Sequence, residues 1–139
     1  MIVGRLLYGA DDHVAQFVGG QIGGDVIYSS HRAIGVLSNN RSKLIAGVVY
    51  YAFDGSNILV DIAATSPHWC RKDILKSLFD YPFEQLGCRR LTSKISAENT
   101  RSLKLCEGLG FCREGLLREG GTDGQDAHVL GLLKSERRF

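Results

Sequence analysis

The chain has 139 residues, the usual size of one globular domain, and 44% of them are hydrophobic, which is enough for one sizeable core. Lysine and arginine number 17 against 15 acidic residues, and the net charge of +2 is too small to indicate a nucleic-acid-binding protein. No segment has the pattern of a secretion signal or of a membrane-spanning helix. We therefore expect one domain over residues 1–139, located in the cytoplasm, without a nucleic-acid or membrane partner.

Four cysteines stand in the second half of the chain, at Cys70, Cys88, Cys106 and Cys112. None of their spacings is C-x-x-C, so the sequence argues against a zinc site and against a redox pair, and we expect no metal. Separated thiols of this kind fit a reducing compartment, where they commonly pack as small buried hydrophobic groups.

The first part of the chain predicts a strand, a helix and a meander of three strands. Residues 2–8 are strand-like, and Asp11 or Asp12 can cap a helix in which apolar residues recur at helical spacing. Gly19 and Gly20 predict the end of this helix. Three strand-like runs follow, separated by turn-forming residues, and predict an antiparallel meander: residues 33–37, 44–53 and 58–65.

Beyond Pro67 the period of the apolar residues changes from that of a strand to that of a helix. Pro82 should kink or interrupt this helix, because proline lacks the backbone donor and clashes with the preceding turn. Gly87 should end it, since glycine commonly follows the last helical residue.

The last third of the chain predicts a strand, a short helix and a hairpin. Residues 89–96 alternate between apolar and polar side chains, and Asn99 opens a short helix that Gly110 closes. Residues 111–118 and 128–133 flank a turn-rich segment and predict the hairpin. The complete order, β-α-β-β-β-α-β-α-β-β, places the chain in the mixed α/β (α+β) class.

Five linked motifs accompany this order in the second half of the chain. They are Leu86-Gly87-Cys88-Arg89-Arg90-Leu91, Asn99-Thr100-Arg101-Ser102, Leu109-Gly110-Phe111, Glu114-Gly115 and Leu117-Arg118. Together with the element order they resemble the GNAT superfamily of N-acetyltransferases, in particular the branch that acetylates ribosomal-protein N-termini and the small GNAT proteins of phages. The resemblance implies a mostly antiparallel sheet flanked by helices, in which the fourth strand (58–65) and the fifth (89–96) splay apart.

The resemblance further implies acetyl-coenzyme A as the co-substrate. In the GNAT fold the edge of the fourth strand pairs with the pantetheine amides, which here indicates the backbone of Ile62, Ala63 and Ala64. The helix-opening asparagine corresponds to Asn99, and Ser102 accompanies it. From the residues alone, Asn99 is equally a plain helix cap, and the two alanines equally fit a crowded contact between helix and sheet.

The phosphate-binding loop departs from the GNAT pattern, because no glycine occurs between Gly55 and Gly87. The corresponding helix start holds Arg71, Lys72, Asp73 and Ile74. A helix N-terminus binds anions even without glycines, so we expect these four residues to receive the pyrophosphate. The alternative is that coenzyme A binding is weakened or lost.

The catalytic groups also depart from the GNAT pattern. The tyrosine that often serves as the acid, seven residues after the helix-opening asparagine, is Cys106 here. A thiol with a pKa of about 8.5 could protonate the leaving thiolate, although Cys106 also lies on the apolar face of its helix. The usual glutamate base is absent from the fourth strand, which leaves Asp61, Glu98, His68 or a water chain for that role.

The resemblance thus implies an acetyl-coenzyme A dependent N-acetyltransferase that moves an acetyl group directly to a primary amine, on a protein N-terminus or a small molecule, in a ternary complex. The alternative is a catalytically inactive GNAT-fold module that binds coenzyme A or another protein. Edge strands near the C-terminus also favour a homodimer.

Overall fold

Eight strands form one mixed sheet in the computed structural model, which describes residues 1–23 and 26–139. The strands are β1 (Ile2–Val3), β2 (Leu6–Leu7), β3 (His31–Leu37), β4 (Leu44–Tyr51), β5 (Asn57–Ala64), β6 (Arg90–Ser96), β7 (Cys112–Leu117) and β8 (Ala127–Leu133). The α-helices of the described residues are α1 (Asp11–Ile22), α2 (Lys72–Asp80) and α3 (Thr100–Leu109). Short helical turns occupy Pro67–Trp69, Tyr81–Gln85 and Lys134–Glu136.

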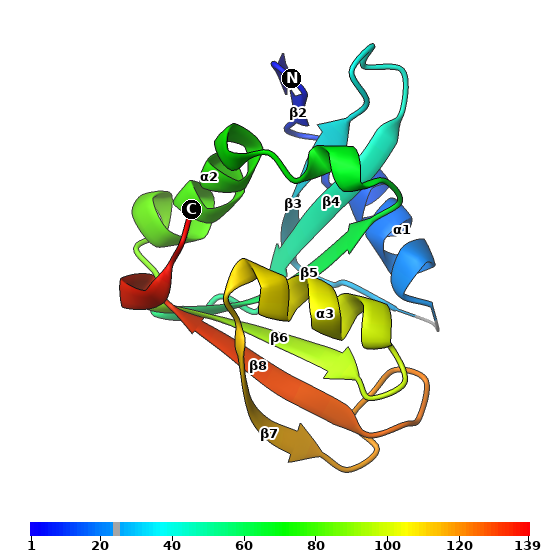
Figure 1. Cartoon of the computed structure of the whole chain (residues 1–139), viewed down its shortest axis with the longest axis vertical. Coiled ribbons are helices and arrows are strands. Elements are labelled where there is room, and N and C mark those ends of the chain that lie inside the picture. Colours follow the sequence, from blue (N-terminus) through cyan, green and yellow to red (C-terminus); the bar gives the residue numbers. More distant parts are fainter. Residues whose placement is uncertain (24–25) are drawn as a thin grey trace.

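The sheet has the order β1-β2-β3-β4-β5-β6-β8-β7, and its neighbouring strands run antiparallel except for β5 and β6. These two parallel strands pair over only three positions, from Asn57 opposite Arg90 to Leu59 opposite Thr92. Beyond Leu59 they diverge, and α3 lies over the gap between the two halves of the sheet (Figure 1). The predicted splay and the mostly antiparallel sheet are confirmed.

One face of the sheet is covered by α1, whose Val14 and Val18 pack against β3, β4 and β5. The helix begins after Ala10 rather than with an aspartate cap, because the Asp11 carboxylate instead accepts a hydrogen bond from the Ala33 N–H at 2.9 Å. It also continues through the predicted stop at Gly19 and Gly20 to Ile22, and ends at Gly23, whose φ of +87° suits glycine.

The other face carries α2, α3 and the larger apolar core (Figure 1). Pro82 does interrupt the predicted helix, since α2 ends at Asp80 and a π-helical turn follows over Tyr81–Gln85. α3 matches its prediction closely: Asn99 is the N-cap and Gly110, with a φ of +111°, is the C-cap. No helix among residues 1–23 and 26–139 is both long and apolar enough to cross a membrane.

The remaining predicted elements are present with small changes of extent. The first strand is divided into β1 and β2 by a turn at Gly4, whose φ is +61°. The meander is present as β3, β4 and β5, and the closing hairpin as β7 and β8. That residues 1–139 fold as a single domain stays a prediction.

Substitution of Gly47 tests the close approach of α1 to the sheet. An added Cβ at this position would lie 2.8 Å from Val14 Cγ1 and 3.0 Å from Val18 Cγ2. We expect Gly47→Ala to lower the free energy of unfolding by roughly 1–3 kcal/mol, the usual cost of overpacking a core. Gly20→Ala, at an exposed helical position with open space, should instead raise it by about 0.5–1 kcal/mol. Urea denaturation of both variants measures the difference, and equal stabilities would contradict this packing.

Candidate active site

The splay between β5 and β6 opens into two pockets that share Asn99 and Ser102 in their walls. The first pocket has a volume of about 390 Å³ and reaches from the end of α1 to β6 and the 121–123 turn. The second has a volume of about 420 Å³ and lies between the end of β5, residues 66–70 and α3. A ligand that passes Asn99 and Ser102 would therefore extend from one pocket into the other.

Beyond Leu59 the backbone of β5 presents groups to this splay that do not pair with another strand of the described residues. The Ser56 carbonyl accepts a hydrogen bond from Arg89 on the β6 side, whereas the Thr65 N–H donates to Ile45 on the β4 side, at 2.8 Å in both cases. Because backbone groups alternate sides along a strand, Ile62 and Ala64 direct theirs into the splay.

The same alternation separates Ala63 from its two neighbours. Its backbone groups point toward β4, where it lies opposite Gly47, and its side chain packs in the core beneath α1. Ala63 thus lines the second pocket while its backbone groups point away from the splay.

Asn99 and Ser102 are placed in the splay by the N-terminal cap of α3. The Asn99 side-chain oxygen accepts a hydrogen bond from the Ser102 N–H at 3.1 Å, and this bond fixes the Asn99 side chain at the first turn of the helix. The predicted helix cap is confirmed. The amide nitrogen of Asn99 is a separate donor at the junction of the two pockets.

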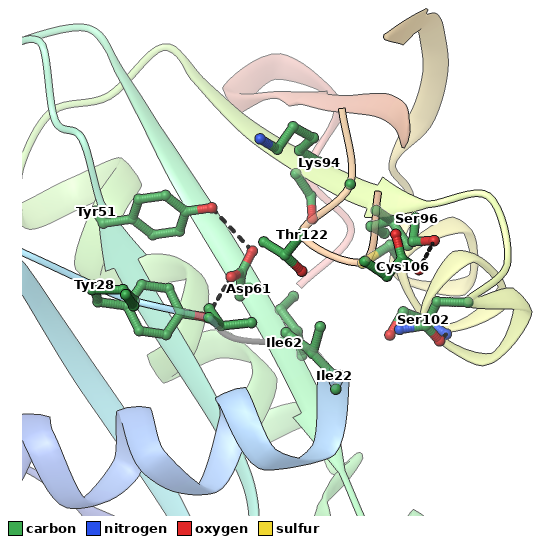
Figure 2. A pocket seen from close by; sticks show the side chains of 18 residues that line it. Ile22, Tyr28, Tyr51, Asp61, Ile62, Lys94, Ser96, Ser102, Cys106 and Thr122 are labelled. Atoms are coloured by element: carbon green, nitrogen blue, oxygen red, sulfur yellow. Dashed lines mark hydrogen bonds between the residues drawn. The ribbon is translucent and has the colours of Figure 1, made fainter. Parts of the chain in front are cut away.

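Asp61 is a buried carboxylate in the wall of the first pocket. It accepts hydrogen bonds from the hydroxyl groups of Tyr28 and Tyr51, the latter at 3.2 Å, and Figure 2 shows both phenol oxygens converging on it. Burial raises the pKa of Asp61 above its ordinary value, and the two tyrosine hydrogen bonds partly oppose that effect. The pocket therefore contains an oriented carboxylate shielded from bulk water.

The two tyrosines act as neutral hydrogen-bond donors. Burial raises the pKa of Tyr28 and of Tyr51, and the Asp61 charge beside them raises both further. Their rings also pack edge to face, with centroids 5.2 Å apart. Sequence reasoning missed both residues. Tyr28 lies in a segment without a motif. Tyr51 stands two residues after Val49 in the same strand, so the alternation of side chains along that strand could have indicated which face of the sheet Tyr51 occupies.

Cys106 lies in the wall of the first pocket and also in the apolar core beneath α3. Burial raises the pKa of its thiol to about 12, although hydrogen bonding with Ser93 partly opposes this. Proton transfer from such a thiol to a thiolate whose own acid has a pKa of about 8.5 costs roughly 5 kcal/mol. Cys106 is therefore suited to donating a hydrogen bond rather than a proton.

The other predicted site residues lie outside the walls of the two pockets. Glu98 and His68 are exposed, and the second pocket ends at Cys70, before the start of α2. Ile74 is buried in the core, and Arg71 forms an ion pair of 3.3 Å with Asp73. Among residues 1–23 and 26–139 no cluster of three or more histidine, cysteine or acidic side chains is arranged to hold a metal.

Comparisons with known proteins agree with this geometry. A chimera of the spermidine N-acetyltransferase SpeG from Vibrio cholerae and hSSAT superimposes with a TM-score of 0.66 and 18% identity, over 94% of this chain and 96% of the other. The ribosomal-protein-S5-alanine acetyltransferase from Vibrio fischeri gives a TM-score of 0.59 and 18% identity, over 78% of this chain and 64% of the other. The chain has the GNAT fold.

A sequence relative carries the same acetyltransferase name. The uncharacterized N-acetyltransferase p20 of Bacillus licheniformis is 37% identical over 75 residues, which are 50% of this chain and 42% of the relative. The chain thus spans less than half the length of that protein. No family model matches the sequence. The resemblance to GNAT N-acetyltransferases, drawn from the element order and the motifs between Leu86 and Arg118, is confirmed.

The pH dependence of stability tests the buried state of Asp61. Because its pKa is raised in the folded protein, the folded state holds more protons than the unfolded chain above pH of about 4, and the free energy of unfolding falls as the pH rises. Asp61→Asn removes this loss. We expect denaturation at a series of pH values to show that the free energy of unfolding of the variant rises relative to that of the wild type as the pH rises.

Asp123→Asn is the matched control with the opposite sign. Hydrogen bonds from the Ser96 hydroxyl and the Gln125 N–H hold the pKa of Asp123 below its ordinary value. The free energy of unfolding of Asp123→Asn should therefore fall relative to that of the wild type as the pH rises. Parallel curves for Asp61→Asn and the wild type would show that Asp61 titrates as it does in water.

Proposed function

We propose that this chain is an acetyl-coenzyme A dependent N-acetyltransferase that transfers an acetyl group directly to a primary amine. One observation carries the proposal: two pockets meet at Asn99 and Ser102 in the β5/β6 splay. A buried carboxylate lies on one side, and on the other lies a strand edge that pairs with no other strand of the described residues. The direct reaction needs both substrates in place at once, and the two joined pockets supply a place for each.

The second pocket and the edge of β5 suit the pantetheine arm of the co-substrate. Extended amides add to an open strand edge by backbone hydrogen bonds, and Ile62 and Ala64 direct their backbone groups there. Ala64 also has a small side chain that permits close approach. Asn99 lines the same pocket, and its side-chain amide matches the amide chemistry of pantetheine.

The first pocket suits an amine that arrives as a cation. Asp61 provides the negative charge, and the rings of Tyr28 and Tyr51 stand beside it. Ile22, Ile27 and Ile62 add apolar walls for the carbon chain that carries the amine. Two of the similar structures are named for spermidine and for ribosomal-protein alanine, and both names describe primary-amine acceptors.

The reaction joins the amine nitrogen to the acetyl carbon and breaks the bond between that carbon and the coenzyme A sulfur. The cationic amine first loses one proton to solvent, because only the neutral nitrogen has a lone pair for the attack. As that nitrogen attacks, a second proton on it becomes acidic, and Asp61 accepts this proton directly or through one water. The Ile62 N–H faces the splay and donates a hydrogen bond to the oxygen that becomes negative. Cys106 hydrogen-bonds the departing sulfur, which takes its proton from solvent.

Binding of the co-substrate is the first test of this proposal. Acetyl-coenzyme A at about 100 times its Kd should stabilise the folded protein by roughly 2.7 kcal/mol, which thermal denaturation detects as a higher melting temperature. An unchanged melting temperature at millimolar acetyl-coenzyme A would exclude the proposal. Stabilisation without any acetyl transfer would instead support the alternative, a catalytically inactive module that binds coenzyme A.

Acetyl transfer is the second test, measured as thiol release with spermidine, an alkyl diamine and a peptide with a free N-terminus. Asp61→Asn should lower kcat/KM by about a hundredfold to ten-thousandfold, the usual contribution of a general base. Glu98→Gln changes an exposed carboxylate outside both pockets and should leave the rate unchanged. The reverse ranking of these two variants would assign the base to Glu98.

The acceptor class, the cytoplasmic location and the homodimer expected from the sequence belong to this proposal as well. The homodimer draws support from β7, which forms one edge of the sheet and exposes all six of its residues. Leu116 and Leu117 are the large apolar side chains on that strand.

A further inference from the structure

The second pocket is positively charged, and its charge comes from α3. Arg101 and Lys104 are the charged side chains among its described lining residues, and no carboxylate stands among those residues. The two cations are three residues apart, so they lie on the same side of the helix. A pocket with this lining favours an anion.

The start of α2 is a poorer place for an anion in this chain. Arg71 forms its ion pair with Asp73, a carboxylate in the first turn of that helix. That negative charge opposes a phosphate at the same helix end. The second pocket also ends at Cys70, and none of the residues 71–74 lines it.

Arg101 also occupies the strand edge that the proposed function assigns to pantetheine. Its guanidinium donates a hydrogen bond of 2.6 Å to the Ala64 carbonyl, one of the backbone groups that β5 directs into the splay. An arriving pantetheine N–H would need the same carbonyl, and the contact with Arg101 must then open. The guanidinium is exposed to solvent, so it is free to turn toward a ligand in the second pocket.

We propose that Arg101 is the phosphate-binding residue of the second pocket and that it exchanges the Ala64 carbonyl for a coenzyme A phosphate when the cofactor binds. This inference rests on the proposed function. The exchange is favourable because a guanidinium binds phosphate by charge-assisted, often bidentate hydrogen bonds that are stronger than its bond to a neutral carbonyl. Lys104 adds a second positive charge to the same pocket.

Calorimetric titration with coenzyme A and with pantetheine, which has no phosphate, separates the two roles of Arg101. Arg101→Ala should weaken coenzyme A binding by about tenfold to a hundredfold, because it removes charge-assisted hydrogen bonds. The same variant should bind pantetheine about two- to tenfold more tightly, because the Ala64 carbonyl is then open. Arg101→Lys keeps the charge and should retain more coenzyme A affinity than Arg101→Ala.

Two control variants locate the effect. Arg138→Ala removes another exposed guanidinium that contacts a carbonyl, that of Gly108 at the far end of α3, and should leave both affinities unchanged. Arg71→Ala should also leave them unchanged, and a larger loss of coenzyme A affinity there than in Arg101→Ala would place the phosphates at α2 and overturn the inference. Equal weakening of coenzyme A and pantetheine by Arg101→Ala would overturn it too.

Wild-type protein that binds neither compound would contradict the proposed function itself, and the inference would fall with it. Wild-type binding of coenzyme A that Arg101→Ala leaves intact would instead contradict the inference alone.

Discussion

The parting of β5 and β6 is the constraint on which the rest of this structure depends. Strands of one sheet normally continue to pair, because an unpaired backbone group removed from water is costly. Here the pairing stops at Leu59, and the carbonyl of Ala64 is satisfied by a side chain from a helix. α3 covers the gap, and its capping residue Asn99 stands between the two pockets. The fold therefore keeps a strand edge open inside the molecule, where it is protected from pairing with other chains.

A second consequence of this arrangement is the environment of Asp61. A carboxylate in the middle of a central strand loses hydration, and the chain offsets that loss with two tyrosine hydroxyls rather than with a cation in direct contact. Among residues 1–23 and 26–139 no cation forms an ion pair with Asp61, and Lys94 acts on it only through its charge, so the carboxylate is still available to a ligand. A site of this kind costs stability and supplies binding energy, as functional sites in proteins commonly do.

Much of the fold could be predicted from the sequence, because the signals that determine it are local. Asn99 and Gly110 cap the two ends of α3 as expected, and α2 ends just before Pro82 as expected. The end of α1 was predicted too early, because Gly19 and Gly20 are tolerated inside a helix that packs on the sheet through Val14 and Val18. Tertiary packing there outweighed a local glycine signal.

The site was harder to predict, since its parts come together only through the sheet. Asp61 was one of several titratable candidates in the sequence, and what distinguishes it is burial between Tyr28 and Tyr51, residues 33 and 10 positions away in the chain. Arg101 stood within a predicted motif, but its contact with Ala64 depends on how α3 lies over the splay. The backbone groups of Ala63 also point to the opposite side of β5 from those of Ile62 and Ala64, and residue types alone do not indicate this difference.

The two tyrosines that hold Asp61 come from different kinds of structure. Tyr51 is the last residue of a central strand, whereas Tyr28 belongs to the connection between α1 and β3. Connections of this kind tolerate changes of length and sequence far better than core strands do. Under the proposed function, the amine preference can therefore diverge through the α1–β3 connection, while the strand edge and α3 retain the same co-substrate. Evolution of the acceptor range is in this way separated from preservation of the fold.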